Sequence, residues 1–514
     1  MSLARRFLFG SGLSLVDQVL KIASAFILTP IIVNGLGADL YGAWSLLIAV
    51  FAQYGWLDLG LAVSMPRFFA KAISSKEPGA IRSLASTGAG IFLCVAVISA
   101  AVTVVVAWLA PAWFEAPKAA EVARSVVIVF GTFLAVQTTA QLSLGYLKGH
   151  LRYDKIALAS IIRVTLTSVL FVICIQRGWG LLGISLIHAG CGILECAMLT
   201  MFSRGLQPPL TANLREFDKT RARELLGFSA AAFVINASAN LRSTFQPIII
   251  ASQISEAAVT DYSLGSRFPI LFVDLAHIVA GGQLIALFSR LAGPAHLEDL
   301  KRAFVFACRM CAAMAVLGAG IMWMFGLPFL QRWIPAHALE AWSVLMPSVL
   351  PKALFVAQTP SMAVLFALAR HKRLAVWDWV GGLCNVALTW WLCAQVGAAG
   401  AGWATCIEQS LICAFVWPMF AARALGLTFS EVCGGLLVWP VLRAALILAP
   451  CTLLLRYAQP DYLILTAIGL TSCAWFSVAS IFTMGTEEKT WLLKLMPFLA
   501  RFGIKGGATA NDAS

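Results

Sequence analysis

The sequence is a succession of long apolar runs that begin near residue 12 and recur until about residue 484. Runs of about 20 residues are long enough to cross a hydrocarbon core of roughly 30 Å as helices. The run at 91–109 lacks the alternation of apolar and polar residues that a membrane-spanning β-strand needs. Because 60% of the residues are hydrophobic and 12% are charged, little of the chain remains for a soluble domain. The sequence therefore predicts an all-α polytopic membrane protein of about fourteen transmembrane helices.

The expected helices are separated by short turns, several of which contain glycine or proline. Short connections of this kind join neighbouring antiparallel helices. The predicted ranges are 12–34, 40–65, 84–110, 121–146, 155–175, 181–203, 225–251, 261–289, 303–327, 341–369, 374–395, 399–422, 432–455 and 461–484.

Lysine and arginine accumulate on alternate connecting segments. With the N-terminus placed in the cytoplasm, 25 of the 37 basic residues fall in inner segments and five in outer segments. Because basic residues of short loops gather on the cytoplasmic side, both termini are expected there, with an even number of crossings. Twelve helices remain an alternative to fourteen. The net charge of +13 is explained by this topology, and no folded basic domain is available to bind nucleic acid.

The thirteen cysteines lie in or beside the predicted helices, where they are expected to act as small apolar packing residues. Cys308 and Cys311 have metal-ligand spacing, but neither a second pair nor a nearby histidine completes a site. We therefore expect neither a bound metal nor a cofactor.

The two halves of the sequence resemble each other at an offset of 217 residues. The segment 29–33, TPIIV, aligns with 246–250, QPIII. Internal repeats in transporters predict two lobes with the substrate path between them. The expected organisation is an N-terminal lobe, a cytoplasmic linker, a C-terminal lobe, two further helices and a cytoplasmic tail, at 1–203, 204–224, 225–425, 426–484 and 485–514.

Three segments resemble the polysaccharide transporter family, which includes the O-antigen repeat-unit flippases and belongs to the multidrug, oligosaccharidyl-lipid and polysaccharide exporter superfamily. Residues 35–67 (GLGADLYGAWSLLIAVFAQYGWLDLGLAVSMPR) are similar to the family's first two helices. Residues 145–153 (GYLKGHLRY) resemble its basic loop after helix four, and residues 261–267 (DYSLGSR) resemble the start of helix eight.

The resemblance implies two six-helix lobes in a V, plus two C-terminal helices, that alternate between inward-open and outward-open states. It implies a flippase that carries a polyprenyl-diphosphate-linked oligosaccharide across the bacterial inner membrane, for O-antigen or exopolysaccharide synthesis. Membrane lipids are expected partners, as are glycosyltransferases and a polymerase of the same pathway. Helices one, two, seven and eight line the cavity in such proteins.

Ionisable residues inside these helices are the candidate site, because charge at bilayer depth is costly unless it meets a wet cavity or a partner. We expect Lys21, Arg242 and Arg267 to bind the diphosphate in a cationic cavity. Two simpler interpretations stay open. Lys21 could pair with Asp17 four residues earlier, and Arg267 could reach the outer interface.

Three acids are candidates for coupling or for counter-ions. Asp17 and Asp274 lie within predicted helices, and Asp274 shares a helix face with Arg267. Asp58 lies near the inner end of helix two, where it could instead pair with Arg67 or cap backbone groups.

Prolines inside the predicted helices are candidate hinges, namely Pro30, Pro247 and Pro351. Lys352 follows Pro351 directly, so it could belong to a hinge, line a lipid groove or pack as a buried cation. The arginines on helices away from the cavity are expected to pair with an acid or with lipid phosphate. These arginines are Arg163, Arg309 and Arg443, and the candidate acids are Glu195, Asp378 and Glu408.

The sequence contains no G-x-x-x-x-G-K-[ST] phosphate loop, so coupling to an ion or to the membrane potential is expected instead of ATP hydrolysis by that route. Uncoupled flipping stays open as an alternative. A membrane glycosyltransferase or polysaccharide ligase would need acids or histidines in a sizeable outer loop. The largest expected one, around 328–341, offers only His337 and Glu340, so we do not expect an enzyme. A multidrug or cation antiporter of the same superfamily is the stronger alternative, although it would favour an acidic cavity.

Overall fold

The computed structural model describes residues 3–57, 60–75, 79–114, 117–277, 282–292, 297–368, 370, 372–432 and 471. These residues form helices and turns, with no strand among them, which confirms the all-α polytopic fold class. Eight helical segments within the described ranges are long and apolar enough to cross a membrane. The expected helices 432–455 and 461–484 and the tail lie essentially outside the described residues.

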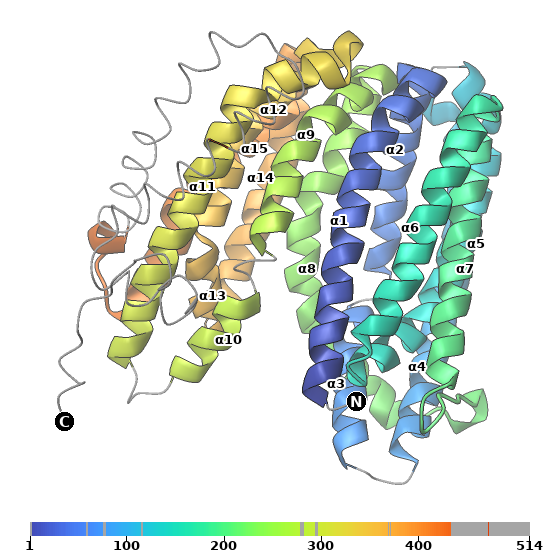
Figure 1. Cartoon of the computed structure of the whole chain (residues 1–514), viewed down its shortest axis with the longest axis vertical. Coiled ribbons are helices and arrows are strands. Elements are labelled where there is room, and N and C mark those ends of the chain that lie inside the picture. Colours follow the sequence, from blue (N-terminus) through green and yellow to red (C-terminus); the bar gives the residue numbers. More distant parts are fainter. Residues whose placement is uncertain are drawn as a thin grey trace. The chain divides into compact units, whose positions relative to one another are not determined.

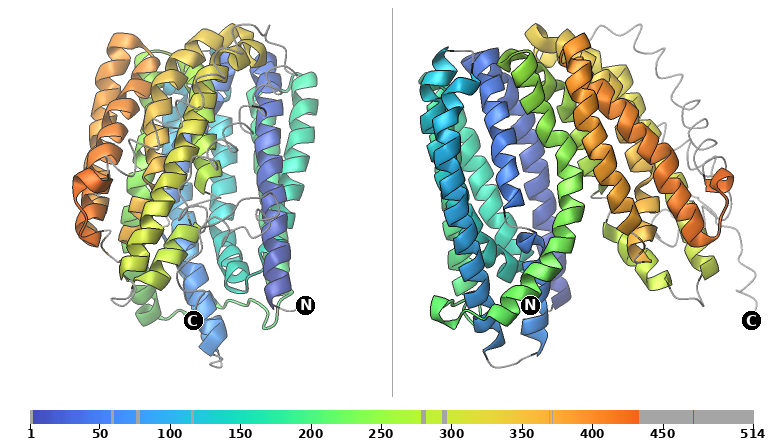
Figure 2. Two further views of the ribbon diagram at one scale, coloured as in Figure 1. Left: turned by 60° about the vertical axis from the view of Figure 1, so that its left-hand side comes forward. Right: turned by 180° about the vertical axis from the view of Figure 1, so that it is seen from behind.

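The chain divides into two compact units, Met1–Thr260 and Asp261–Ser514. The helices of the first unit run alongside one another (Figures 1 and 2). They are α1 (Leu3–Leu36), α2 (Ala38–Ala52), η1 (Gln53–Trp56), α3 (Leu61–Ser75), α4 (Ala80–Leu109), η2 (Ala110–Trp113), α5 (Pro117–Gly149), α6 (Tyr153–Gln176), α7 (Gly180–Arg204), η3 (Leu214–Glu216) and α8 (Lys219–Gln253).

The second unit contains helices with partly corresponding contacts. Its members are α9 (Glu256–Ala276, which begins in the first unit), α10 (Gly282–Leu291), α11 (Leu297–Trp333), η6 (Pro335–His337), α12 (Ala338–Ala357), α13 (Thr359–Ala367), α14 (Lys372–Val396), α15 (Ala399–Leu411), η7 (Ile412–Val416) and α16 (Trp417–Leu425). Contacts of α4 with α5, α5 with α7 and α6 with α7 have counterparts in α11 with α12, α12 with α15 and α14 with α15.

Helix α8 explains why the units divide at residue 260. It contacts α2, α3 and α4 of the first unit, and the Ser64 and Ser229 hydroxyls lie 2.5 Å apart between α3 and α8. Asp218 caps α8 by accepting a hydrogen bond from the backbone N–H of Thr220 at 2.8 Å. The predicted domain boundaries, with a second lobe starting at 225, remain a prediction.

Several expected helices are interrupted. The range 40–65 is not one helix, because α2 ends at Ala52 and α3 begins at Leu61. Gly60 has a φ of 79°, and a Cβ atom there would lie 2.7 Å from the carbonyl oxygen of Ser229. The break therefore depends on a backbone conformation that favours glycine and on close packing against α8.

In the repeat-related range 261–289, α9 is described up to Ala276 and α10 from Gly282, and residues 278–281 lie outside the described part of the chain. Range 341–369 divides at Gln358, and a π-helical turn, Ile412–Val416, interrupts 399–422. Cys308 and Cys311 are 1% and 2% exposed in α11, which confirms that they are packing residues.

Candidate functional site

The first candidate cation is paired within its own helix. Lys21 Nζ lies 2.7 Å from Asp17 Oδ2, one turn earlier on α1. The lysine side chain keeps 43% of its surface exposed, whereas the aspartate keeps 12%. The predicted ion pair is therefore present, and its exposed end is the ammonium group. Whether Lys21 also contacts substrate stays a prediction.

The two candidate arginines belong to different units. Arg242 is half-buried in α8, next to the buried residue Leu241, and Arg267 is half-buried in α9. Both arginines take part in at least one polar, ionic or ring contact. The cavity that they would share with Lys21 stays a prediction.

The candidate acids have different environments. Asp274 is exposed on α9, and the helix is continuous from Arg267 to Asp274, so the two residues lie on one helix face. Asp17 has one carboxylate oxygen on Lys21, and its other oxygen is buried without a hydrogen bond among the described residues. Asp58 lies outside the described residues.

The candidate hinge prolines all lie inside helices that continue past them. Pro30 is half-buried in α1, whereas Pro247 in α8 and Pro351 in α12 are buried. Lys352 donates a hydrogen bond of 3.0 Å from Nζ to Gln409 Oε1 of α15. This hydrogen bond connects α12 to α15. The hinge role of Lys352 and of the three prolines remains a prediction.

Lys352 borders a buried polar cluster that sequence reasoning did not identify. Asn385 of α14 is fully buried, and its Nδ2 lies 3.5 Å from both Glu408 Oε2 and Thr405 Oγ1 of α15. Glu408 and Gln409 are 4% and 5% exposed. Buried ionisable groups in a membrane helix are costly, so this cluster is a further candidate site. The spacing of Thr405, Glu408 and Gln409 on one face of α15 was the available signal.

The first unit has a half-buried ion pair between α6 and α7. Arg163 Nη1 of α6 lies 3.0 Å from Glu195 Oε2 of α7, so this arginine pairs with one of the acids expected for the arginines outside the cavity helices. Two turns earlier on α7, His188 packs against aromatic rings. Its ring centroid lies 5.6 Å from that of Trp44 and 5.4 Å from that of Phe130. This histidine is therefore a packing residue.

The segment 328–341, which was predicted to be an outer loop, is largely helical. Helix α11 continues to Trp333, and η6 occupies Pro335–His337. His337 Nδ1 lies 2.7 Å from Asp261 Oδ1 of α9. The contact crosses 76 residues of sequence, so spacing alone could not predict it. His337 thus connects η6 to the N-terminal part of α9 within the second unit.

A family model described as "Polysaccharide biosynthesis protein" matches residues 85–292. No curated protein sequence matches the chain.

Solved transporters share the fold at low identity. The lipid II flippase MurJ, in an inward closed conformation, has a TM-score of 0.70 at 12% identity, covering 92% of this chain and 98% of that one. An inward-facing multidrug resistance MATE family transporter has a TM-score of 0.68 at 16% identity, covering 80% and 94%. A MOP superfamily transporter from Pyrococcus furiosus, described as having a binding pocket of reverse polarity that suggests a different function, has a TM-score of 0.58 at 14% identity, covering 82% and 94%.

Proposed function

From the resemblance to the polysaccharide transporter family, which the family model and the shared fold support, we propose that this chain is a flippase for a lipid-linked oligosaccharide. It carries a polyprenyl-diphosphate-linked sugar chain across the bacterial inner membrane by alternating access. Both termini face the cytoplasm, and the sugar chain is used for a cell-surface polysaccharide. Glycosyltransferases and a polymerase of the same pathway supply and use the substrate.

The observation that carries this proposal is the match to a polysaccharide biosynthesis family over residues 85–292. The likeness to the lipid II flippase MurJ supports it, because that fold covers 92% of this chain. Both similarities are to transport and biosynthesis proteins of the membrane. The helical conformation of the outer segment at 335–337 gives no support to the enzyme alternative.

The charges on α1, α8 and α9 suit a diphosphate. Arg242 and Arg267 are half-buried residues of α8 and α9. A guanidinium binds phosphate oxygens through two parallel hydrogen bonds, whereas Lys21 supplies a compact point charge. In this proposal, Asp17, Asp58 and Asp274 balance these cations or couple transport to an ion.

A multidrug or cation antiporter is the second candidate, favoured by the TM-score of 0.68 to a MATE transporter. The Pyrococcus transporter is described by the reverse polarity of its pocket, so pocket charge is the property to compare within this superfamily. A cationic drug would be repelled by the cluster of cations proposed here, whereas a diphosphate would be attracted.

The test is transport by the purified full chain in proteoliposomes. We expect a fluorescent lipid-linked oligosaccharide to be flipped, whereas a cationic dye should not be transported. Arg242→Ala should abolish flipping and Arg242→Lys should restore only part of it. Arg223→Ala, on an exposed position of the same helix, is the matched control. Full flipping by both Arg242→Ala and Arg267→Ala would overturn the cationic site, and transport of the dye alone would favour the antiporter.

A further inference from the structure

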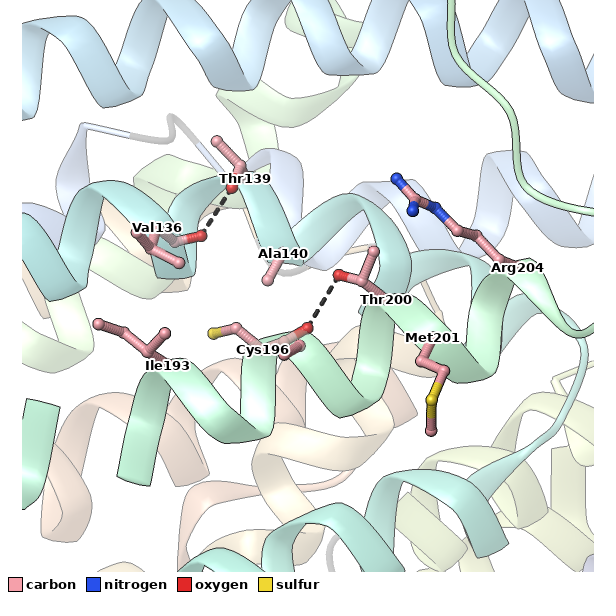
Figure 3. A pocket seen from close by; sticks show the side chains of 9 residues that line it. Val136, Thr139, Ala140, Ile193, Cys196, Thr200, Met201 and Arg204 are labelled. Carbon is pink, nitrogen blue, oxygen red and sulfur yellow. Dashed lines mark hydrogen bonds between the residues drawn. The ribbon is translucent and has the colours of Figure 1, made fainter. Parts of the chain in front are cut away.

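A groove on the first unit lies between α5 and α7 (Figure 3). Its volume is about 440 Å³. The lining side chains recur at three- and four-residue spacing on each helix, so each helix contributes one face. They are Val136, Thr139 and Ala140 of α5, and Ile193, Cys196, Ala197, Thr200, Met201 and Arg204 of α7.

The polar groups of this lining, apart from Arg204, are turned to their own helices. Thr139 Oγ1 donates a hydrogen bond of 2.7 Å to the carbonyl oxygen of Val136, and Thr200 Oγ1 donates one of 2.8 Å to that of Cys196 (Figure 3). Hydroxyls bonded in this way offer few donors to a ligand. The groove therefore suits an apolar chain better than a sugar.

Arg204 ends the groove in the last turn of α7, and its side chain is exposed. Within the described part of the chain, no acid forms an ion pair with it. The groove runs from Ile193 to Arg204, a rise of roughly 16 Å at 1.5 Å per residue. That length is close to one leaflet, which is half of a hydrocarbon core of about 30 Å. Ile193 and Met201 are 39% and 62% exposed, so the groove is open toward surrounding lipid.

We propose that this groove binds one anionic glycerophospholipid of the inner leaflet, with an acyl chain between α5 and α7 and the phosphate on Arg204. The basic-residue distribution places this end of α7 on the cytoplasmic side. Basic pockets between helices on that side recognise anionic headgroups. A cation at a helix C-terminus is also favoured by the helix dipole, but the dipole does not account for an apolar groove leading away from it.

Native mass spectrometry of the full chain in detergent tests this site, with phosphatidylglycerol and phosphatidylcholine of identical acyl chains as probes. We expect phosphatidylglycerol to be retained preferentially. Arg204→Ala should weaken its retention by about tenfold, because one charge-assisted phosphate contact is lost. Arg204→Lys should keep most of the preference, since the charge remains. Arg215→Ala, an exposed arginine in the same connecting region, should change nothing.

A second variant tests the groove itself. Ala197 is an exposed lining residue, so Ala197→Trp fills the groove without entering the core, and it should reduce retention of both lipids. Equal retention of the two lipids by the unaltered protein, or unchanged retention by Arg204→Ala, would overturn the proposal. Displacement of phosphatidylglycerol by an equal concentration of polyprenyl phosphate would also overturn it, since the groove would then hold the substrate's tail.

Discussion

The ion pair between Arg163 and Glu195 allows a quantitative test of how this fold is stabilised. The side chains are 27% and 16% exposed, and the charged atoms lie 3.0 Å apart. At an effective dielectric constant of about 20, this separation corresponds to an attraction of about 5.5 kcal/mol, which desolvation partly offsets. Removing one partner strands the other charge, so Arg163→Met or Glu195→Gln alone should lower the free energy of unfolding by about 3–5 kcal/mol.

The double variant should be much less destabilised than the sum of the two single variants, because it leaves no unpaired charge. We expect a coupling energy of at least about 2 kcal/mol in a double-mutant cycle. Unfolding can be followed in mixed detergent micelles with a thiol-reactive dye once the exposed Cys94 and Cys384 are replaced by serine, since the neighbouring Cys196 is only 6% exposed in the folded chain.

The matched control is the exposed pair of Arg82 and Glu216, whose side chains are 55% and 39% exposed. An exposed pair typically couples by less than about 1 kcal/mol. If the half-buried Arg163–Glu195 pair had a coupling energy no larger than that of this control, the argument that lower exposure strengthens the interaction between its charges would be wrong.

Three further predictions follow from single positions. Gly60→Ala should lower the free energy of unfolding by more than Gly37→Ala, because both residues have positive φ but only Gly60 lies against the backbone of α8; chemical unfolding compares them. Cysteine introduced at Arg177 should react with an impermeant thiol reagent in intact cells, whereas cysteine at Lys219 should react only after permeabilisation, and the reverse pattern would invert the topology. Burial and a nearby arginine lower the pKa of His150, so the unfolded chain binds its proton more readily. Stability should therefore fall as pH drops through the ordinary histidine range, and His150→Gln should reduce that loss in pH-dependent unfolding.

Hydropathy predicted the described helices well, because each helix must satisfy its backbone hydrogen bonds internally within lipid. Hydropathy did not predict where these helices are interrupted. The break before Leu61 depends on Gly60 meeting the backbone at Ser229, and a contact across 169 positions has no local signature.

In the candidate site too, the sequence predicted contacts within one helix but not contacts between residues on separate helices. Lys21 and Asp17 were identified because four-residue spacing brings side chains together on any helix. Asn385 and Glu408 come from separate helices, so neither their contact nor their burial follows from spacing. The sequence predicted that Arg163 needs a partner, but it did not single out Glu195 as that partner.

The packing of α8 on the first unit determines where this chain can be divided into two expressed pieces. A break within 205–218 would separate α8 from α2, α3 and α4, and would also interrupt a segment fixed to α4. In that segment, the backbone N–H of Asn213 donates to Ser86 Oγ at 2.9 Å, and the N–H of Asp218 donates to Thr87 Oγ1 at 3.2 Å. A break at Ile254–Ser255, after α8 ends, keeps these contacts within one piece. Fragment complementation should therefore succeed at the second position and fail at the first.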